Sequence, residues 1–218
     1  MEPGKTIVSL LILLTFAGPS SAGELMAVVK DAFGKPVKDA VIYAVPASGK
    51  TPAVPSPKAK VVDQVDRTFI DHVTPLLVNT PVKFPNSDNI RHHVYSLSKP
   101  KTFELPLYIG SPSEPVVFDK PGVVALGCNI HDWMIAYVLV VETPYFGKTG
   151  EDGQASVKGM PEDEYNIYVW HPRMKAAVEG ELIKKVKIGA AAMQVEAQLK
   201  LTPEFRPRRA PVIGAKRY

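Results

Sequence analysis

Side chains that bind soft metals gather in two short stretches of the sequence. Cys128, His131 and Met134 follow one another at the spacing C-x2-H-x2-M, and two adjacent histidines, His92 and His93, precede them. One thiolate, two imidazoles and a weak axial thioether form the ligand set of a mononuclear type 1 (blue) copper site. Sulfur suits Cu(I) and imidazole suits both oxidation states, so the pattern predicts one copper ion that exchanges electrons.

Zinc is the rival metal for sulfur and nitrogen donors. Structural zinc takes several Cys or His ligands and does not use Met, and catalytic zinc keeps an open position for water. Met134 therefore favours copper. The chain has a single cysteine, which excludes a disulfide framework and a cysteine-rich zinc site.

Each of these residues also has an ordinary structural interpretation, since a lone Cys is most often a small buried hydrophobe. Two further histidines fit that interpretation better. His72, next to Asp71, is expected to be structural. His171 lies close to Met174 and is expected at a strand end, with a second, weaker copper site as the alternative.

The composition determines which elements can position these side chains. The chain has 218 residues, enough for one large domain or two small ones. Its 21 prolines and 15 glycines exclude a helix bundle, because proline breaks helical hydrogen bonding. We therefore expect an all-β protein of short strands and turns.

Residues 61–141 form one block of short apolar runs that turn residues interrupt, which predicts a small β-sandwich. Both stretches of candidate ligands lie in this block. Neighbouring residues of a strand point to opposite faces, so only one of His92 and His93 can bind the metal.

Two outer segments, 23–47 and 142–201, carry further strand-like runs. A two-stranded hairpin is barely stable alone, so neither segment is expected to fold by itself. The economical prediction is one split sandwich, with the 61–141 block inserted between its strands. Residues 48–60 are rich in proline and read as a stiffened linker.

The outer segments resemble a known family. The stretches "KDAFGKPVKDAVIYAV" and "TGEDGQASVKGMPEDEYNIYVWHP" are similar to carboxypeptidase-regulatory or transthyretin-like domains. The resemblance implies a second, small Ig-like or transthyretin-like β-sandwich, and it implies no chemistry.

The middle block resembles the cupredoxins, the blue-copper family of amicyanin and plastocyanin. The stretches "FPNSDNIRHHVYS" and "FDKPGVVALGCNIHDWM" carry the likeness, which implies a Greek-key β-sandwich. By position it makes Cys128 the thiolate, His131 the second imidazole and Met134 the axial sulfur. The family has His followed by Asn and Val, so the first imidazole is His92 and His93 replaces the Asn.

Two departures from the cupredoxin pattern bear on the potential and on docking. Leu126 and Gly127 precede the cysteine where relatives usually have an aromatic residue, and Asp132 stands where proline is common. In the family, electrons pass through the solvent edge of the second histidine. We therefore expect Trp133 and Asp132 to contribute to docking of a redox partner, a cytochrome or a dehydrogenase by analogy.

The first 22 residues read as a secretory signal. Lys5 precedes the apolar stretch Ile7–Ala17, and small residues follow it up to Ala22, where cleavage is expected. The apolar stretch is about half of the roughly 20 residues that a membrane span needs. The sequence thus predicts an exported, periplasmic protein that does not span the membrane.

The net charge of +4 is concentrated in the basic tail 202–218, which leaves the remainder close to neutral. A neutral folded part argues against nucleic-acid binding, which needs a basic stripe on a structured face. The sequence offers no nucleophile–base pair, so we expect an electron carrier and no enzyme. The alternatives are a copper carrier or store without a redox role, and a structural module of the cell envelope.

Overall fold

A computed structural model describes residues 23–53, 56–112, 114–175 and 180–204. The expected signal, residues 1–22, and the tail from residue 205 onward lie outside the described residues. Every regular element within these ranges is a β-strand, which confirms the all-β prediction. The described part of the chain contains no helix long and apolar enough to cross a membrane.

One sandwich, called here the outer sandwich, is built from the two ends of the described chain. Its three-stranded sheet has the order β14 (Gln154–Met160), β1 (Gly23–Asp31), β17 (Met193–Leu199). Its four-stranded sheet has the order β13 (Phe146–Lys148), β2 (Val41–Pro46), β15 (Asp163–Trp170), β16 (Glu181–Ile188). Residues alternate between buried and partly exposed along β1, as a strand with one face in a core requires.

The second sandwich, called the middle sandwich, is formed by the residues between β2 and β13. Its five-stranded sheet has the order β6 (Val73–Leu77), β12 (Ile135–Val141), β11 (Gly122–Gly127), β8 (His92–Ser98), β9 (Lys101–Tyr108). Its three-stranded sheet has the order β10 (Val116–Phe118), β7 (Thr80–Lys83), β3 (Lys60–Val61). A separate short hairpin joins β4 (Gln64–Val65) to β5 (Thr68–Phe69).

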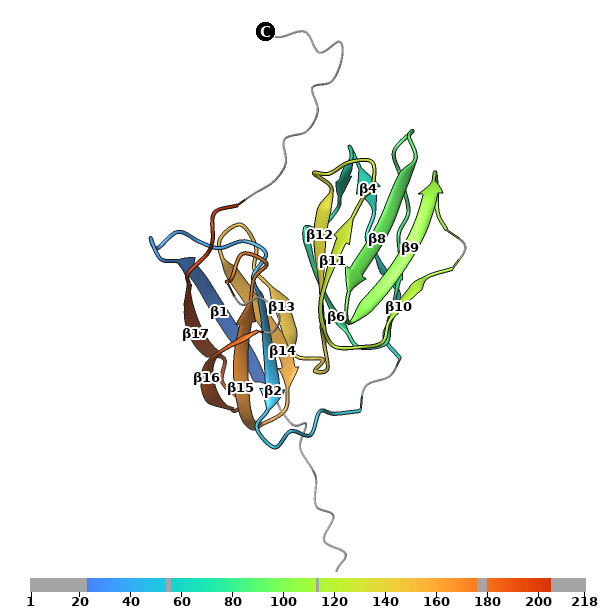
Figure 1. Cartoon of the computed structure of the whole chain (residues 1–218). Coiled ribbons are helices and arrows are strands. Elements are labelled where there is room, and N and C mark those ends of the chain that lie inside the picture. The colour runs from blue at the N-terminus through green and yellow to red at the C-terminus, as the bar shows by residue number, and fades with distance from the viewer. Residues whose placement is uncertain (1–22, 54–55, 113, 176–179, 205–218) are drawn as a thin grey trace, which may run out of the picture.

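The two sandwiches lie side by side, and the chain crosses between them twice (Figure 1). Residues far apart in sequence pair within the outer sandwich, for example Val28 with Gln154 and Tyr43 with Tyr168. The chain therefore leaves the outer sandwich after β2 and returns to it at β13.

A small apolar cluster joins the sandwiches. Val41 and Trp170 of the outer sandwich pack with Val73, Leu139 and Val141 of the middle one, and all five are buried. Such burial is worth roughly 1.5–3 kcal/mol for each large side chain. The cluster explains why two separate cores sit against each other.

A polar contact adds to this interface. Lys148 on β13 donates to Asp71 Oδ1 at 2.9 Å and to the carbonyl oxygen of Val73 at 2.8 Å. Both acceptors belong to the middle sandwich, so this lysine connects the two bodies.

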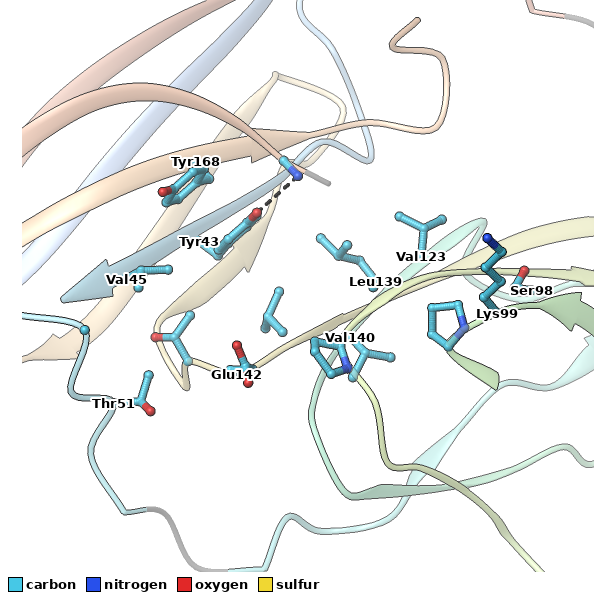
Figure 2. A pocket seen from close by; sticks show the side chains of 17 residues that line it. Tyr43, Val45, Thr51, Ser98, Lys99, Val123, Leu139, Val140, Glu142 and Tyr168 are labelled. Carbon is cyan, nitrogen blue, oxygen red and sulfur yellow. Dashed lines mark hydrogen bonds between the residues drawn. The ribbon is translucent and has the colours of Figure 1, made fainter. Parts of the chain in front are cut away.

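A groove of about 920 Å³ opens beside this interface (Figure 2). Tyr43 and Tyr168 stack on its outer-sandwich wall, with ring centroids 5.1 Å apart, and the Tyr43 hydroxyl accepts a hydrogen bond from the Gly180 amide. Lys99 and Glu142 are the charged residues of the lining, which contains no histidine or cysteine. The groove is therefore separate from the candidate metal ligands.

Candidate metal centre

Three of the expected ligands converge at one end of the middle sandwich. His92 opens β8, Cys128 follows β11, and His131 lies in the turn that leads to β12. His131 Nδ1 lies 3.2 Å from His92 Nδ1 and 3.6 Å from Cys128 Sγ. One donor atom from each residue lies within 4.8 Å of the others, and no other group of three such residues occurs in the described ranges.

The sheet itself brings the two stretches together. β11 pairs with β12 along its length and with β8 at Gly127 and Tyr95. The ligand turn and the start of β8 therefore meet at the same edge of the sandwich. The turn is compact, because the Met134 amide donates to the carbonyl oxygen of His131 at 2.9 Å.

Met134, the expected axial ligand, is buried in the core of the middle sandwich. Its exposed fraction is 1%, and it belongs to the same apolar cluster as Cys128 and Leu126. The structure thus places it on the inner side of the ligand turn.

The structure separates the two adjacent histidines. His92 is fully buried and faces His131, whereas the ring of His93 points to β9, with its Nε2 2.8 Å from Glu104 Oε1. The Nδ1 atom of His93 is buried and has no hydrogen-bond partner. The geometry brings only His92 to Cys128 and His131, as strand alternation requires.

A carboxylate fixes the orientation of the His92 ring. His92 Nε2 donates to Asp88 Oδ2 at 2.6 Å, which leaves the lone pair of Nδ1 directed at His131. A metal-binding histidine commonly donates its second nitrogen to a carboxylate in this way, which fixes the tautomer and increases the basicity of the ligand. Asp88 is therefore part of the candidate site.

Burial and neighbouring groups shift the pKa values of His131 and Asp88. Burial disfavours the charged form of His131 and, together with the neighbouring His92 ring and Arg67, lowers its pKa, so the neutral form of His131 is favoured. Burial opposes the ionisation of Asp88, but hydrogen bonds from the Arg67 amide and the His92 ring outweigh it and lower the pKa of the carboxyl. A neutral imidazole beside an ionised carboxylate is the state a metal ligand requires.

The spacing of the donors fits one transition-metal ion held by nitrogen and sulfur. Bonds from nitrogen or sulfur to such a metal are roughly 2.0–2.3 Å, so three donors around one ion are about 3.5–3.8 Å apart. The spacings of 3.2 and 3.6 Å from His131 Nδ1 are close to this range. His92 and Cys128 are buried and His131 is partly exposed, so the site has one solvent-facing ligand.

The structure shows what surrounds the two departures from the cupredoxin pattern, Gly127 before the cysteine and Asp132 after His131. The Tyr95 ring lies against Gly127, so closely that a Cβ there would approach a ring carbon to 2.9 Å. An aromatic ring thus covers the residue before Cys128, but it comes from the neighbouring strand. Asp132 is exposed next to His131, and the Trp133 ring lies 5.1 Å from the His131 ring.

The other candidate histidines have structural partners. The Nδ1 atom of His72 lies 3.2 Å from the carbonyl oxygen of Ile135. His171 accepts a hydrogen bond from the Arg173 amide at Nδ1, and it makes a second hydrogen bond with the Lys38 backbone. Because backbone groups engage the His171 ring, the geometry favours the expected structural role over a second copper site.

His171 makes the stability of the protein depend on pH. Burial, with the nearby charges of Arg173 and His72, lowers its pKa from 6.5 to about 4. Between these values the unfolded chain binds a proton that the folded chain does not, so stability falls as the pH drops from 6.5 to 4. At 1.36 kcal/mol per pKa unit, the loss is at most about 3 kcal/mol.

Denaturant unfolding at pH 7 and pH 4.5 tests this effect. The difference in unfolding free energy between the two pH values is expected to be smaller in His171→Gln than in the unchanged protein. Equal differences in the two proteins would contradict the assignment to His171.

Sequence reasoning missed Asp88 and the turn Asp66–Arg67, whose amides also bind the Asp88 carboxylate. Asp88 lies four residues before His92, and this spacing was the available signal. It is a weak one, because the path of the loop between them decides whether the carboxylate reaches the ring.

The chain matches no protein-family model and no curated protein. Among solved structures it is similar to a reduced Cu(I) form of an amicyanin mutant, with 20% identity over 45% of this chain and 99% of that chain, at a TM-score of 0.35. It is also similar to the Cu-containing nitrite reductase NirK of Thermus scotoductus SA-01, with 24% identity over 53% of this chain and 28% of that chain, at a TM-score of 0.37. A purple cupredoxin from Nitrosopumilus maritimus shows 20% identity over 39% of this chain and all of that chain, at a TM-score of 0.33.

Proposed function

We propose that the middle sandwich holds one copper ion of type 1 and that the protein is an exported electron carrier of the periplasm. The observation that carries the proposal is the convergence of His92 Nδ1, His131 Nδ1 and Cys128 Sγ at one end of the sandwich. Met134 is proposed as the weak axial donor, since it ends the same turn and is buried in the same apolar cluster as the cysteine.

Copper in such a site would supply a one-electron couple, and the protein would supply a fixed geometry. Asp88 orients His92, the compact turn fixes His131, and the core of the sandwich surrounds Cys128 and Met134. A preorganised set of ligands limits the rearrangement that accompanies a change of oxidation state. Four protein donors around one ion would also leave no open position for a substrate, which supports a carrier over an enzyme.

The partly exposed His131 edge is the proposed path for electrons. Trp133 packs beside this ring and Asp132 is exposed next to it, so both would contact a redox partner. A cytochrome or a dehydrogenase is the proposed class of partner. A carboxylate in this position would favour a partner with a positively charged rim, because charges at the rim mainly set association rates.

Visible spectroscopy and voltammetry of the copper-loaded mature protein test the proposal. An intense thiolate-to-Cu(II) band and a reversible one-electron potential are expected. Tight Cu(I) binding without a stable Cu(II) form would indicate a copper carrier or store instead. If the protein has no affinity for copper, only the alternative of a structural module remains. The mass of the mature chain isolated from the periplasm would test export.

Met134→Leu is expected to retain copper and to raise the reduction potential, because the axial donor to Cu(II) is lost. A tenfold selective loss of Cu(II) affinity corresponds to about 59 mV for a one-electron couple. Voltammetry of the variant measures the shift. Met160→Leu, at a buried methionine of the outer sandwich, is the matched control and should leave the potential unchanged. An unchanged potential in Met134→Leu would rule out the axial role.

A further inference from the structure

The β4–β5 hairpin lies beside both candidate histidine ligands. Its turn consists of Asp66 and Arg67, whose φ angles are +53° and +54°. Two successive residues in the left-handed region suit a tight hairpin, but residues other than glycine adopt this conformation at a cost. Contacts outside the hairpin must therefore hold the turn.

The first contact leads to His92. Asp88 Oδ1 accepts the Asp66 amide at 2.7 Å, and Asp88 Oδ2 accepts the Arg67 amide at 2.9 Å. The same Oδ2 atom accepts His92 Nε2 at 2.6 Å. One carboxylate thus joins the tip of the hairpin to the first imidazole.

The second contact leads to His131. Trp133 Nε1 donates to the carbonyl oxygen of Arg67 at 3.1 Å. The Trp133 ring in turn lies 5.1 Å from the His131 ring at an angle of 51°. Arg67 therefore binds Asp88 through its backbone amide and Trp133 through its carbonyl oxygen.

The base of the hairpin is also fixed to the loop that carries Asp88. The Ser87 hydroxyl donates to Asp63 Oδ2 at 2.8 Å, and the Ser87 amide donates to the carbonyl oxygen of Gln64 at 3.0 Å. The Gln64 side chain donates to the Tyr108 hydroxyl at 2.6 Å. Hydrogen bonds therefore hold the hairpin both at its base and at its tip.

We infer that the β4–β5 hairpin is a positioning element that holds the His92 and His131 rings in their mutual arrangement through Asp88 and Trp133. The inference rests on the metal site proposed above, and it adds that the two histidines are positioned as one unit. Neither Asp88 nor Trp133 would bind the metal itself. Both act through the histidine rings and are therefore positioning residues. Such supporting contacts typically change metal affinity by 10–100-fold.

A double-mutant cycle of Asp88→Asn and Trp133→Phe tests this coupling. Asn retains one acceptor oxygen but cannot accept all three hydrogen bonds, and Phe keeps a smaller aromatic ring without the indole N–H. Each single change is expected to weaken copper affinity, by 10–100-fold for Asp88→Asn. If one hairpin serves both rings, the double variant loses less than the product of the single effects, as coupled residues do. Multiplicative effects would overturn the inference.

Amide hydrogen exchange of the metal-free protein provides a second readout. Trp133→Phe is expected to accelerate exchange at the Asp66 and Arg67 amides, which the indole does not touch. Asp88→Asn should accelerate exchange at the same amides. Asp119→Asn is its matched control, since it makes the same change at a carboxylate bound to Lys101 in the same sandwich, and it should leave these amides unchanged.

The two tests separate failure of the inference from failure of the proposed function. Unchanged exchange at both amides in Trp133→Phe would contradict the hairpin's role even if copper binds. A protein that binds no copper, but whose amides exchange faster in Trp133→Phe, would refute the metal site and retain the mechanical link.

Discussion

Cys128→Ser is expected to lose the intense visible band of the copper-loaded protein completely. That band arises from charge transfer between the thiolate and Cu(II), and a serine hydroxyl does not ionise to replace it. Cys128 Sγ lies 3.6 Å from His131 Nδ1, so the change removes the thiolate from the group that it forms with His92 and His131. The loss of copper affinity should exceed the 10–100-fold typical of supporting residues. Copper titration followed by visible absorption measures both effects.

The stability of Cys128→Ser provides its control. The side chain is 4% exposed, and a buried hydroxyl without a partner costs about 1–3 kcal/mol. Denaturant unfolding of the metal-free variant should show a folded protein with a loss of this size. A folded variant that keeps the visible band would disprove the role of Cys128, whereas loss of colour in a folded variant supports it.

His92→Ala is expected to abolish stable copper binding, and His93→Ala is expected to retain it. His92 faces the other donors, while His93 contacts Glu104, whose side chain is 71% exposed. Even if both groups were charged, a contact with one exposed partner would contribute only about 0–1 kcal/mol, so the His93 substitution should mainly create a cavity. Copper stoichiometry and the visible spectrum of the two variants measure the contrast.

These two histidines are matched controls for each other. They are adjacent, both are buried, and both substitutions remove the same volume. A difference in copper binding between the two variants therefore shows which ring points toward the metal site, because general destabilisation should be similar in both. Loss of copper from His93→Ala with retention in His92→Ala would reverse the assignment.

The sequence predicted the parts of the molecule that depend on local pattern. Proline and glycine frequency with short apolar runs predicted an all-β chain, which is confirmed. Strand alternation predicted that His92 and His93 face opposite sides, and the structure places their rings on different partners. The strand pairs β1–β14 and β2–β15 join the same two segments that sequence analysis combined.

The parts that could not be predicted depend on long-range contacts. The β4–β5 hairpin has only two residues in each strand, and its Asp66–Arg67 turn lacks the glycine that usually signals such a turn. Asp88 anchors it from a different loop, so no local pattern could reveal the link. The Tyr95 ring over Gly127 likewise comes from across the sheet, where sequence spacing gives no information.

The insertion of one sandwich into another has a consequence during synthesis. The middle sandwich can complete its pairing from residues 60–141 alone, whereas Val28 must wait for Gln154. At about 5–20 residues per second on the ribosome, that wait lasts roughly 6–25 s. During this interval β1 and β2 are unpaired edges that could associate with other chains. A chain that ends near residue 145 would therefore carry a complete middle sandwich together with β1 and β2, whose partner strands in the outer sandwich are still missing.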